Sequence, residues 1–143
     1  MPFTLKEENI KNALTATALR YGGLLNYAWT IHTANLLARI LLVGGMFQNL
    51  VQRYYFIGNT PSHLILQLSS SFYKPKGEPI VCPWNNIRIL EIKKVAFAKM
   101  VVFKLENEKK FRLRILDSQK QIANYETHRD AFINKFNSLL KPA

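Results

Sequence analysis

The sequence is poor in the residues on which most catalytic and metal sites depend. Its 143 residues include one cysteine, three histidines and nine acidic side chains. A single cysteine excludes an internal disulfide and fits a reducing compartment. Because Cys82 precedes Pro83 in an apolar segment, we interpret it as a buried, unreactive thiol.

Motifs for metal, nucleotide and nucleophile chemistry are also missing. The histidines are far apart, and the sequence contains no HExxH motif, no Cys/His ligand spacing, no glycine-rich phosphate loop and no GxSxG. We therefore expect no metal, no cofactor and no catalytic residues. A triad dispersed along the chain stays open as an alternative, since triads are recognised by geometry.

A secretory signal is not visible near the start of the sequence. Glu7 and Glu8 stand where a signal peptide would carry positive charge. We expect a cytoplasmic protein, peripheral at most to the inner face of the membrane.

Positive charge, by contrast, is abundant. The formal net charge is +11, and fifteen of the 20 basic residues follow residue 71. A basic domain favours an anionic partner, which includes nucleic acid, an anionic membrane surface and an acidic protein patch. A soluble domain that merely happens to be basic is the competing interpretation.

The first 50 residues are predicted to be helical. Apolar residues at helical spacing predict a helix over about residues 5–20, which Gly22 and Gly23 end. The segment LLNYAWTIHTANLLARILLVGGMF (24–47) has no charge from Tyr21 to Ala38, and we expect a second helix packed on the first. A transmembrane or in-plane membrane helix is the alternative, which Arg39 disfavours.

Such a helical hairpin over residues 5–43 exposes a large apolar surface, which usually marks an interface. We therefore predict self-association, most simply as a two-fold dimer, or contact with a protein partner. The predicted interface residues are Leu25, Trp29, Leu36 and Ile40.

From Arg53 the pattern changes to the alternation typical of β-strands. Strands are predicted at RYYFIG, HLILQLSSS, IVCPW, IRILEIKK and two further segments around Phe103 and Phe111. In IRILEIKK the alternation slips between Ile89 and Leu90, which predicts a β-bulge. A last helix is expected from a Ser118–Gln121 capping box onward, packed by Phe132, Phe136 and Leu140.

This order of elements resembles bacterial pleckstrin-homology-like domains, the group that includes GRAM-like domains. The resemblance covers about residues 52–141 and rests on YYFIGNTPSHLILQLSS, EPIVCPWNNIRILEIKK and HRDAFINKFNSLL. It implies a strongly bent antiparallel barrel capped by the C-terminal helix, and a binding or scaffolding module. Lipid-binding members carry basic residues between their first two strands, but GNTPS has none, so inositol-phosphate binding is not transferred.

The chain is accordingly expected to be α+β, with a helical segment at 1–50 and a barrel domain at 51–143. Facing Phe103 with Leu113 and Leu105 with Phe111 sets Lys104 opposite Arg112 and Glu106 opposite Lys110. The predicted anion- or partner-binding residues are Lys93, Lys94, Lys104, Lys110, Arg112 and Arg114.

Two functions remain. The first is a non-catalytic interaction or scaffolding module that binds a protein partner or an anionic surface. The second is a nucleic-acid-binding protein that uses the basic sheet, which the lack of evident aromatic residues on that face disfavours.

Overall fold

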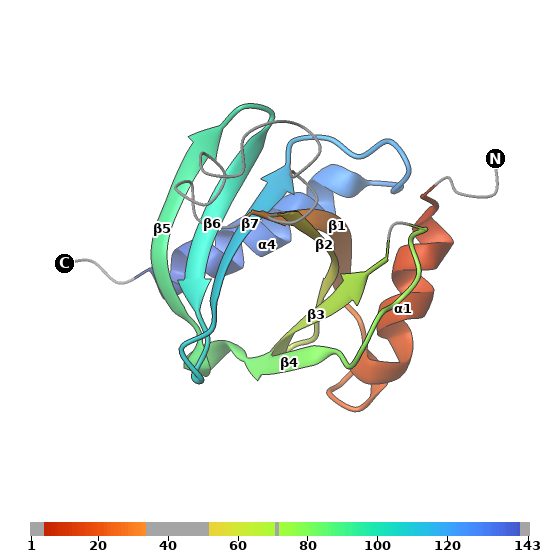
Figure 1. Ribbon diagram of the computed structural model, residues 1–143, viewed down its shortest axis with the longest axis horizontal. Coiled ribbons are helices and arrows are strands. Elements are labelled where there is room, and N and C mark those ends of the chain that lie inside the picture. Colours follow the sequence, from red (N-terminus) through yellow and green to blue (C-terminus); the bar gives the residue numbers. More distant parts are fainter. Residues whose placement is uncertain (1–4, 34–51, 71, 141–143) are drawn as a thin grey trace.

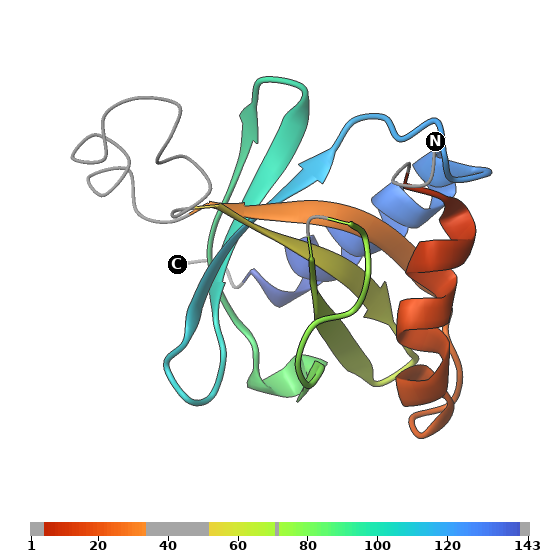
Figure 2. The ribbon, with the colours of Figure 1, turned by 45° about the vertical axis from the view of Figure 1, so that its right-hand side comes forward.

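The computed structural model describes residues 5–33, 52–70 and 72–140 as an α+β fold. One seven-stranded antiparallel sheet curls into a half-barrel, and two helices pack against it, one near each end of the chain (Figures 1 and 2). The strand order is β4-β3-β2-β1-β7-β6-β5.

The sheet consists of two meanders. The first contains β1 (Asn26–Thr33), β2 (Gln52–Asn59), β3 (His63–Ser69) and β4 (Ile80–Pro83), and the second contains β5 (Arg88–Val95), β6 (Ala98–Lys104) and β7 (Lys110–Leu116). A short antiparallel contact joins them, where Ile31 faces Arg114 and His32 faces Leu113. The strands predicted from residue 53 onward are all present, and so is the bulge between Ile89 and Glu91.

The predicted helix over residues 24–47 is wrong for residues 26–33, which form β1. This strand pairs with β2 along its whole length, from Asn26 opposite Asn59 to Thr33 opposite Gln52. Aromatic and β-branched residues such as Trp29, Thr30 and Ile31 favour a strand. These residues carry no charge because β1 lies between two strands and both helices pack against it, which keeps water away. The predicted hairpin of helices is therefore not formed, and residues 34–47 lie outside the described residues.

The predicted register between the last two strands is also wrong. Phe103 faces Phe111, Val101 faces Leu113 and Lys104 faces Lys110, a shift of two residues. The loop is longer than expected, because Leu105 N–H donates to the carbonyl of Lys109 (2.9 Å) and starts a five-residue turn. A shift of two keeps each side chain on its predicted face.

The first helix, α1 (Glu7–Leu19), agrees with the prediction. Ile10, Leu14 and Ala18 are completely buried on its sheet-facing side. The helix approaches β2 so closely that a Cβ at Gly58 would lie 2.9 Å from Leu14 Cδ1. Glycine at this position therefore allows the helix to lie on the sheet.

The second helix, α4 (Tyr125–Leu139), begins later than the predicted capping box at Ser118. Residues 118–124 form an irregular connection instead. Phe132 and Phe136 are completely buried, as predicted, whereas Leu140 is 42% exposed and does not pack the helix. No helix among the described residues is long and apolar enough to cross a membrane.

Candidate functional site

The outer face of β5, β6 and β7 gathers most of the predicted basic residues. Ile89, Phe103 and Phe111 form one row across the three strands and point into the core. Their sequence neighbours Arg88, Lys104 and Lys110 form the adjacent row on the opposite face, because side chains alternate along a strand. We call this outer surface the basic face; it carries Arg88, Lys93, Lys104, Lys110, Arg112 and Arg114.

The basic face contains little opposite charge. Lys93 lies 3.7 Å from Glu91 on the same strand, and Lys104 lies 3.4 Å from Glu108 in the following loop. The first pair is exposed and the second, through Lys104, is partly exposed, so each contributes little to stability. The predicted pairs of Glu106 with Lys110 and of Lys104 with Arg112 do not form, because of the register shift.

The structure divides the predicted residues into two groups. Lys93, Lys104, Lys110, Arg112 and Arg114 share the basic face. Lys94 faces Lys99 on the other side of the hairpin, at its end, and so belongs elsewhere.

Sequence reasoning missed Arg88. The bulge after Ile89 obscured the orientation of the strand, and Arg88 is placed only by its partner Lys104. The signal available was its position just before the apolar Ile89.

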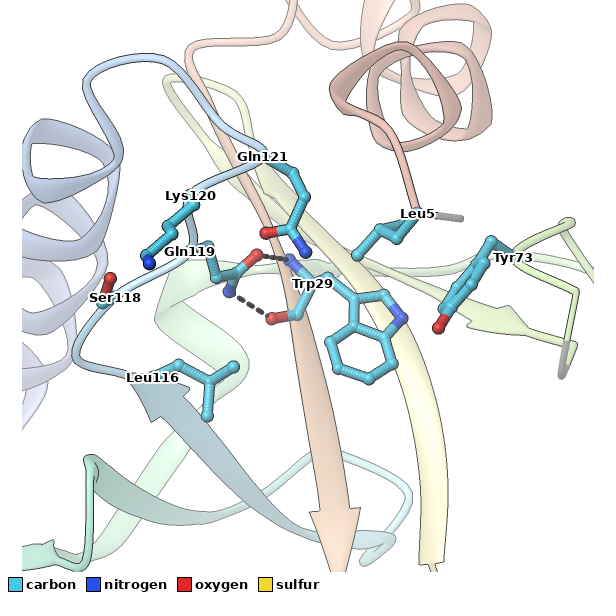
Figure 3. Close-up of a pocket in the computed structure, with 8 residues that line it drawn as sticks. All are labelled: Leu5, Trp29, Tyr73, Leu116, Ser118, Gln119, Lys120 and Gln121. Atoms are coloured by element: carbon cyan, nitrogen blue, oxygen red, sulfur yellow. Dashed lines mark hydrogen bonds between the residues drawn. The ribbon is translucent and has the colours of Figure 1, made fainter. Parts of the chain in front are cut away.

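A second candidate site is a cleft of about 570 Å³ beside β1 (Figure 3). Trp29 and Tyr73 form its aromatic side, and Leu5 and Leu116 add apolar walls. The connection after β7 contributes the polar residues Ser118, Gln119, Lys120 and Gln121.

The cleft lies where the pairing of β1 with β7 has ended. The two strands pair at Ile31 and His32 but not at Trp29. Where the strand ladder stops, the Gln119 side chain replaces it: Trp29 N–H donates to Oε1 (3.3 Å), and Nε2 donates to the Trp29 carbonyl (2.6 Å; Figure 3). Gln119 is buried, so these two bonds are shielded from water. They fix the Trp29 backbone at the base of the cleft.

The Trp29 side chain belongs to an aromatic cluster on the outer face of the sheet. Its ring stacks on Tyr54 with centroids 5.0 Å apart, and Tyr73 meets it edge-on at 5.9 Å. Ile31 faces Tyr54 on one side and Arg114 on the other, so the cluster adjoins the basic face. Sequence reasoning found no evident aromatic residues on the basic sheet and therefore missed this neighbourhood.

The predicted helical interface is not present as such. Trp29 is half-buried in the sheet, and Leu25 is 53% exposed in the segment just before β1. Leu36 and Ile40 lie outside the described residues. Because residues 26–33 form a strand, the argument for a dimer formed by a helical hairpin fails.

His32 lies where basic side chains from three elements converge. Its Nδ1 accepts the N–H of Arg112 (3.0 Å), and its ring meets Phe111 edge-on at 5.4 Å. Burial, together with the smaller effect of the positive charges of Arg53, Lys109 and Arg112, lowers the pKa of His32 to about 4. The imidazole is therefore neutral at pH 7 and acts as a hydrogen-bond acceptor.

Within the described part of the chain, no three His, Cys, Asp or Glu side chains come together as metal ligands would. Burial raises the pKa of the Cys82 thiol. No protein-family model matches the chain, and no curated protein matches it.

Contrary to the prediction from the sequence, the loop GNTPS does not join the first two strands of the sheet. GNTPS joins β2 to β3, whereas the first two strands of the sheet are β1 and β2. The segment between them, residues 34–51, has Arg39 as its one basic residue and lies outside the described residues.

Proposed function

We propose that this chain is a non-catalytic interaction domain that binds an anionic partner through its basic face. The observation that carries the proposal is the row Arg88, Lys104 and Lys110, in which three cations lie directly opposite one another across β5, β6 and β7. Like charges in this position destabilise a sheet. An anionic partner relieves that repulsion when it binds.

Protection against edge-to-edge pairing explains only part of this charge. β5 ends the strand order, and basic residues on such an edge discourage aggregation. β6 has a partner strand on both sides, and β7 pairs with β6 along its length and with β1 at Leu113 and Arg114. Lys104 and Arg114 therefore have no edge to protect, and they share one face with Lys110 and Arg112. Their concentration on one face supports a binding role.

We further propose that the domain is of the pleckstrin-homology-like type. Two antiparallel meanders followed by one C-terminal helix support this proposal, because the resemblance implied a bent antiparallel barrel with such a helix. The domain then extends further toward the N-terminus than residues 52–141, since β1 lies between β2 and β7.

The test is to neutralise the row. A variant with Arg88→Gln, Lys104→Gln and Lys110→Gln should elute from an anionic matrix at clearly lower salt than the wild-type protein. Its thermal midpoint should be unchanged or higher, because repulsion within the sheet is removed.

The matched control removes three exposed charges elsewhere, by Arg20→Gln, Lys74→Gln and Lys76→Gln. Net charge falls equally in both variants, so a difference between them reports the arrangement of the charges. Equal elution of the two variants would show that only total charge matters and would overturn the proposal.

A second candidate function is binding of single-stranded nucleic acid. The aromatic cluster of Trp29, Tyr54 and Tyr73 beside Arg114 favours it, because single-strand binders combine cations with stacking platforms. Trp29 fluorescence should then be quenched by an oligonucleotide but not by a polyanion without bases. Equal responses to both ligands would leave the charge-based proposal alone.

A further inference from the structure

The turn between β5 and β6 has an unusual composition. Val95 faces Ala98, so Ala96 and Phe97 form the tip of a tight hairpin. Neither is among the residues that normally build turns, which are Gly, Asn, Asp, Pro and Ser. Phe97 is 85% exposed, more than any other large hydrophobic residue that the structure describes.

The backbone at Phe97 adds to the anomaly. Its φ is +59°, in the left-handed region that glycine and asparagine occupy easily and bulky residues rarely adopt. The Phe97 carbonyl accepts the N–H of Asp117 (2.9 Å), which holds the tip in place. Phe97 is therefore exposed in an unfavourable backbone conformation, and its side chain does not stabilise the fold through burial.

Lysines surround the tip on both sides of the hairpin. Lys94 and Lys99 face each other on one side, and Lys93 lies on the other side, in a row with Met100 and Arg114. Acidic residues near the hairpin are Glu91, which pairs with Lys93, and Asp117 and Asp130, which line a cleft beside Lys99. An apolar point is thus encircled by flexible cations.

We propose that this hairpin tip, Lys93 to Lys99, docks onto an anionic lipid bilayer by inserting Phe97 between the headgroups. The turn projects at the top of both views of the molecule (Figures 1 and 2), so it is convex. A fluid surface accommodates a convex apolar point, whereas a protein partner must offer a preformed pocket. Cations lie on both sides of the tip, so they can contact anionic headgroups on every side of an inserted Phe97.

This inference does not rest on the proposed function. The row Arg88, Lys104 and Lys110 lies at the other end of β5 and β6 from the tip, so the two surfaces can be changed separately. A flat bilayer that receives Phe97 would meet Lys93, Lys94 and Lys99 first.

The experiment is sedimentation of the full chain with vesicles of phosphatidylcholine alone and of phosphatidylcholine with phosphatidylserine. Wild-type protein should bind the mixed vesicles, and binding should fall with salt. Phe97→Asn should weaken binding at least about fivefold, because an apolar side chain is lost from the bilayer. The thermal midpoint should not fall, since asparagine tolerates the left-handed conformation.

Two further variants sharpen the test. Lys94→Gln with Lys99→Gln should weaken binding by about 25-fold, because each lysine near an anionic surface contributes about fivefold. Leu19→Asn is the matched control, because Leu19 is 70% exposed at the end of α1, and its binding should equal that of the wild type.

Direct evidence for insertion comes from Phe97→Trp. Its fluorescence should shift to shorter wavelength on mixed vesicles, after subtraction of the wild-type signal from Trp29 and Trp84. Either of two results would overturn the proposal: wild-type protein that ignores mixed vesicles, or Phe97→Asn that binds them unchanged. A variant that loses vesicle binding but keeps its elution from the anionic matrix would separate the hairpin tip from the row Arg88, Lys104 and Lys110.

Discussion

At the scale of single residues, His32 shows how the fold sets the charge of one side chain. His32 faces Arg53 on β2 and accepts a hydrogen bond from the Arg112 backbone on β7. The positive charge of Lys109 in the β6–β7 loop also lowers the pKa of His32. Tyr55 and Phe111 contact its ring. Burial and these cations together disfavour the imidazolium ion.

We therefore predict a loss of stability in mild acid that depends on His32. Its pKa is about 4 in the folded protein, below the usual value of 6.5, so its contribution is complete above pH 6.5 and is lost as the pH falls toward 4. One proton changes the free energy of unfolding by at most about 1.4 kcal/mol per pH unit, and solvent screening of this partly exposed ring reduces that slope.

The measurement is urea unfolding at several pH values from 7 to 4.5. His32→Asn can retain an acceptor for the Arg112 N–H but does not titrate, so its stability should fall less steeply with acid than that of the wild type. A remaining slope is expected from His128, whose pKa is also lowered, chiefly by burial. Identical pH profiles for both proteins would show that His32 is not the responsible group.

At the scale of elements, the junction of β1 with β7 depends on the Gln119 side chain, which makes the hydrogen bonds that a neighbouring strand would otherwise make. Only two residue pairs connect these strands, and the Gln119 amide then pairs with both backbone groups of Trp29. The same two bonds fix the position of the connection after β7, which lines the cleft. Loss of this contact leaves a buried N–H and a buried carbonyl without partners.

Gln119→Ala should accordingly lower the free energy of unfolding by about 1–3 kcal/mol, the usual cost of unsatisfied buried polar groups. Gln121→Ala is the control, because Gln121 is exposed in the same connection and should change stability by less than about 0.5 kcal/mol. Urea unfolding gives both values. Equal effects would mean that Gln119 does not support β1.

At the scale of the whole molecule, α4 completes the core of a sheet that, in the described part of the chain, does not close on itself. β4 and β5 are the two ends of the strand order, and the helix inserts aromatic side chains into the curve. Phe136 stacks on Phe103 at 5.6 Å and meets Trp84 edge-on at 5.6 Å. This contact joins the second meander to the short helix Trp84–Asn86 that follows the first.

Replacing Phe136 with alanine should therefore cost about 3–5 kcal/mol, as expected for a completely buried aromatic side chain. Leu140→Ala provides the comparison at the exposed end of the helix and should change stability by less than about 0.5 kcal/mol. Thermal or urea unfolding measures both. A loss below about 1 kcal/mol for Phe136→Ala would show that α4 is not docked as described.

The sequence by itself determined the elements whose patterns are local. Alternating residues in β2, β3, β6 and β7, the apolar stripes of α1 and α4, and the slip at Ile89 all report on a single face of one segment. Such patterns follow from the repeat of the backbone, so they hold whatever the rest of the chain does. Most of the basic face could be predicted for the same reason.

Tertiary structure alone decided the features that depend on distant segments. β1 lacks a clear pattern because sheet neighbours and helices cover it, and only its pairing with β2 distinguishes it from a helix. The β6–β7 register has two solutions that keep every side chain on the same face, and the loop selects between them. The contact of Gln119 with Trp29 spans 90 residues, and the row from Arg88 to Lys110 crosses three strands. No local sequence pattern predicts these features, because the interactions that stabilise them form only when distant segments come together.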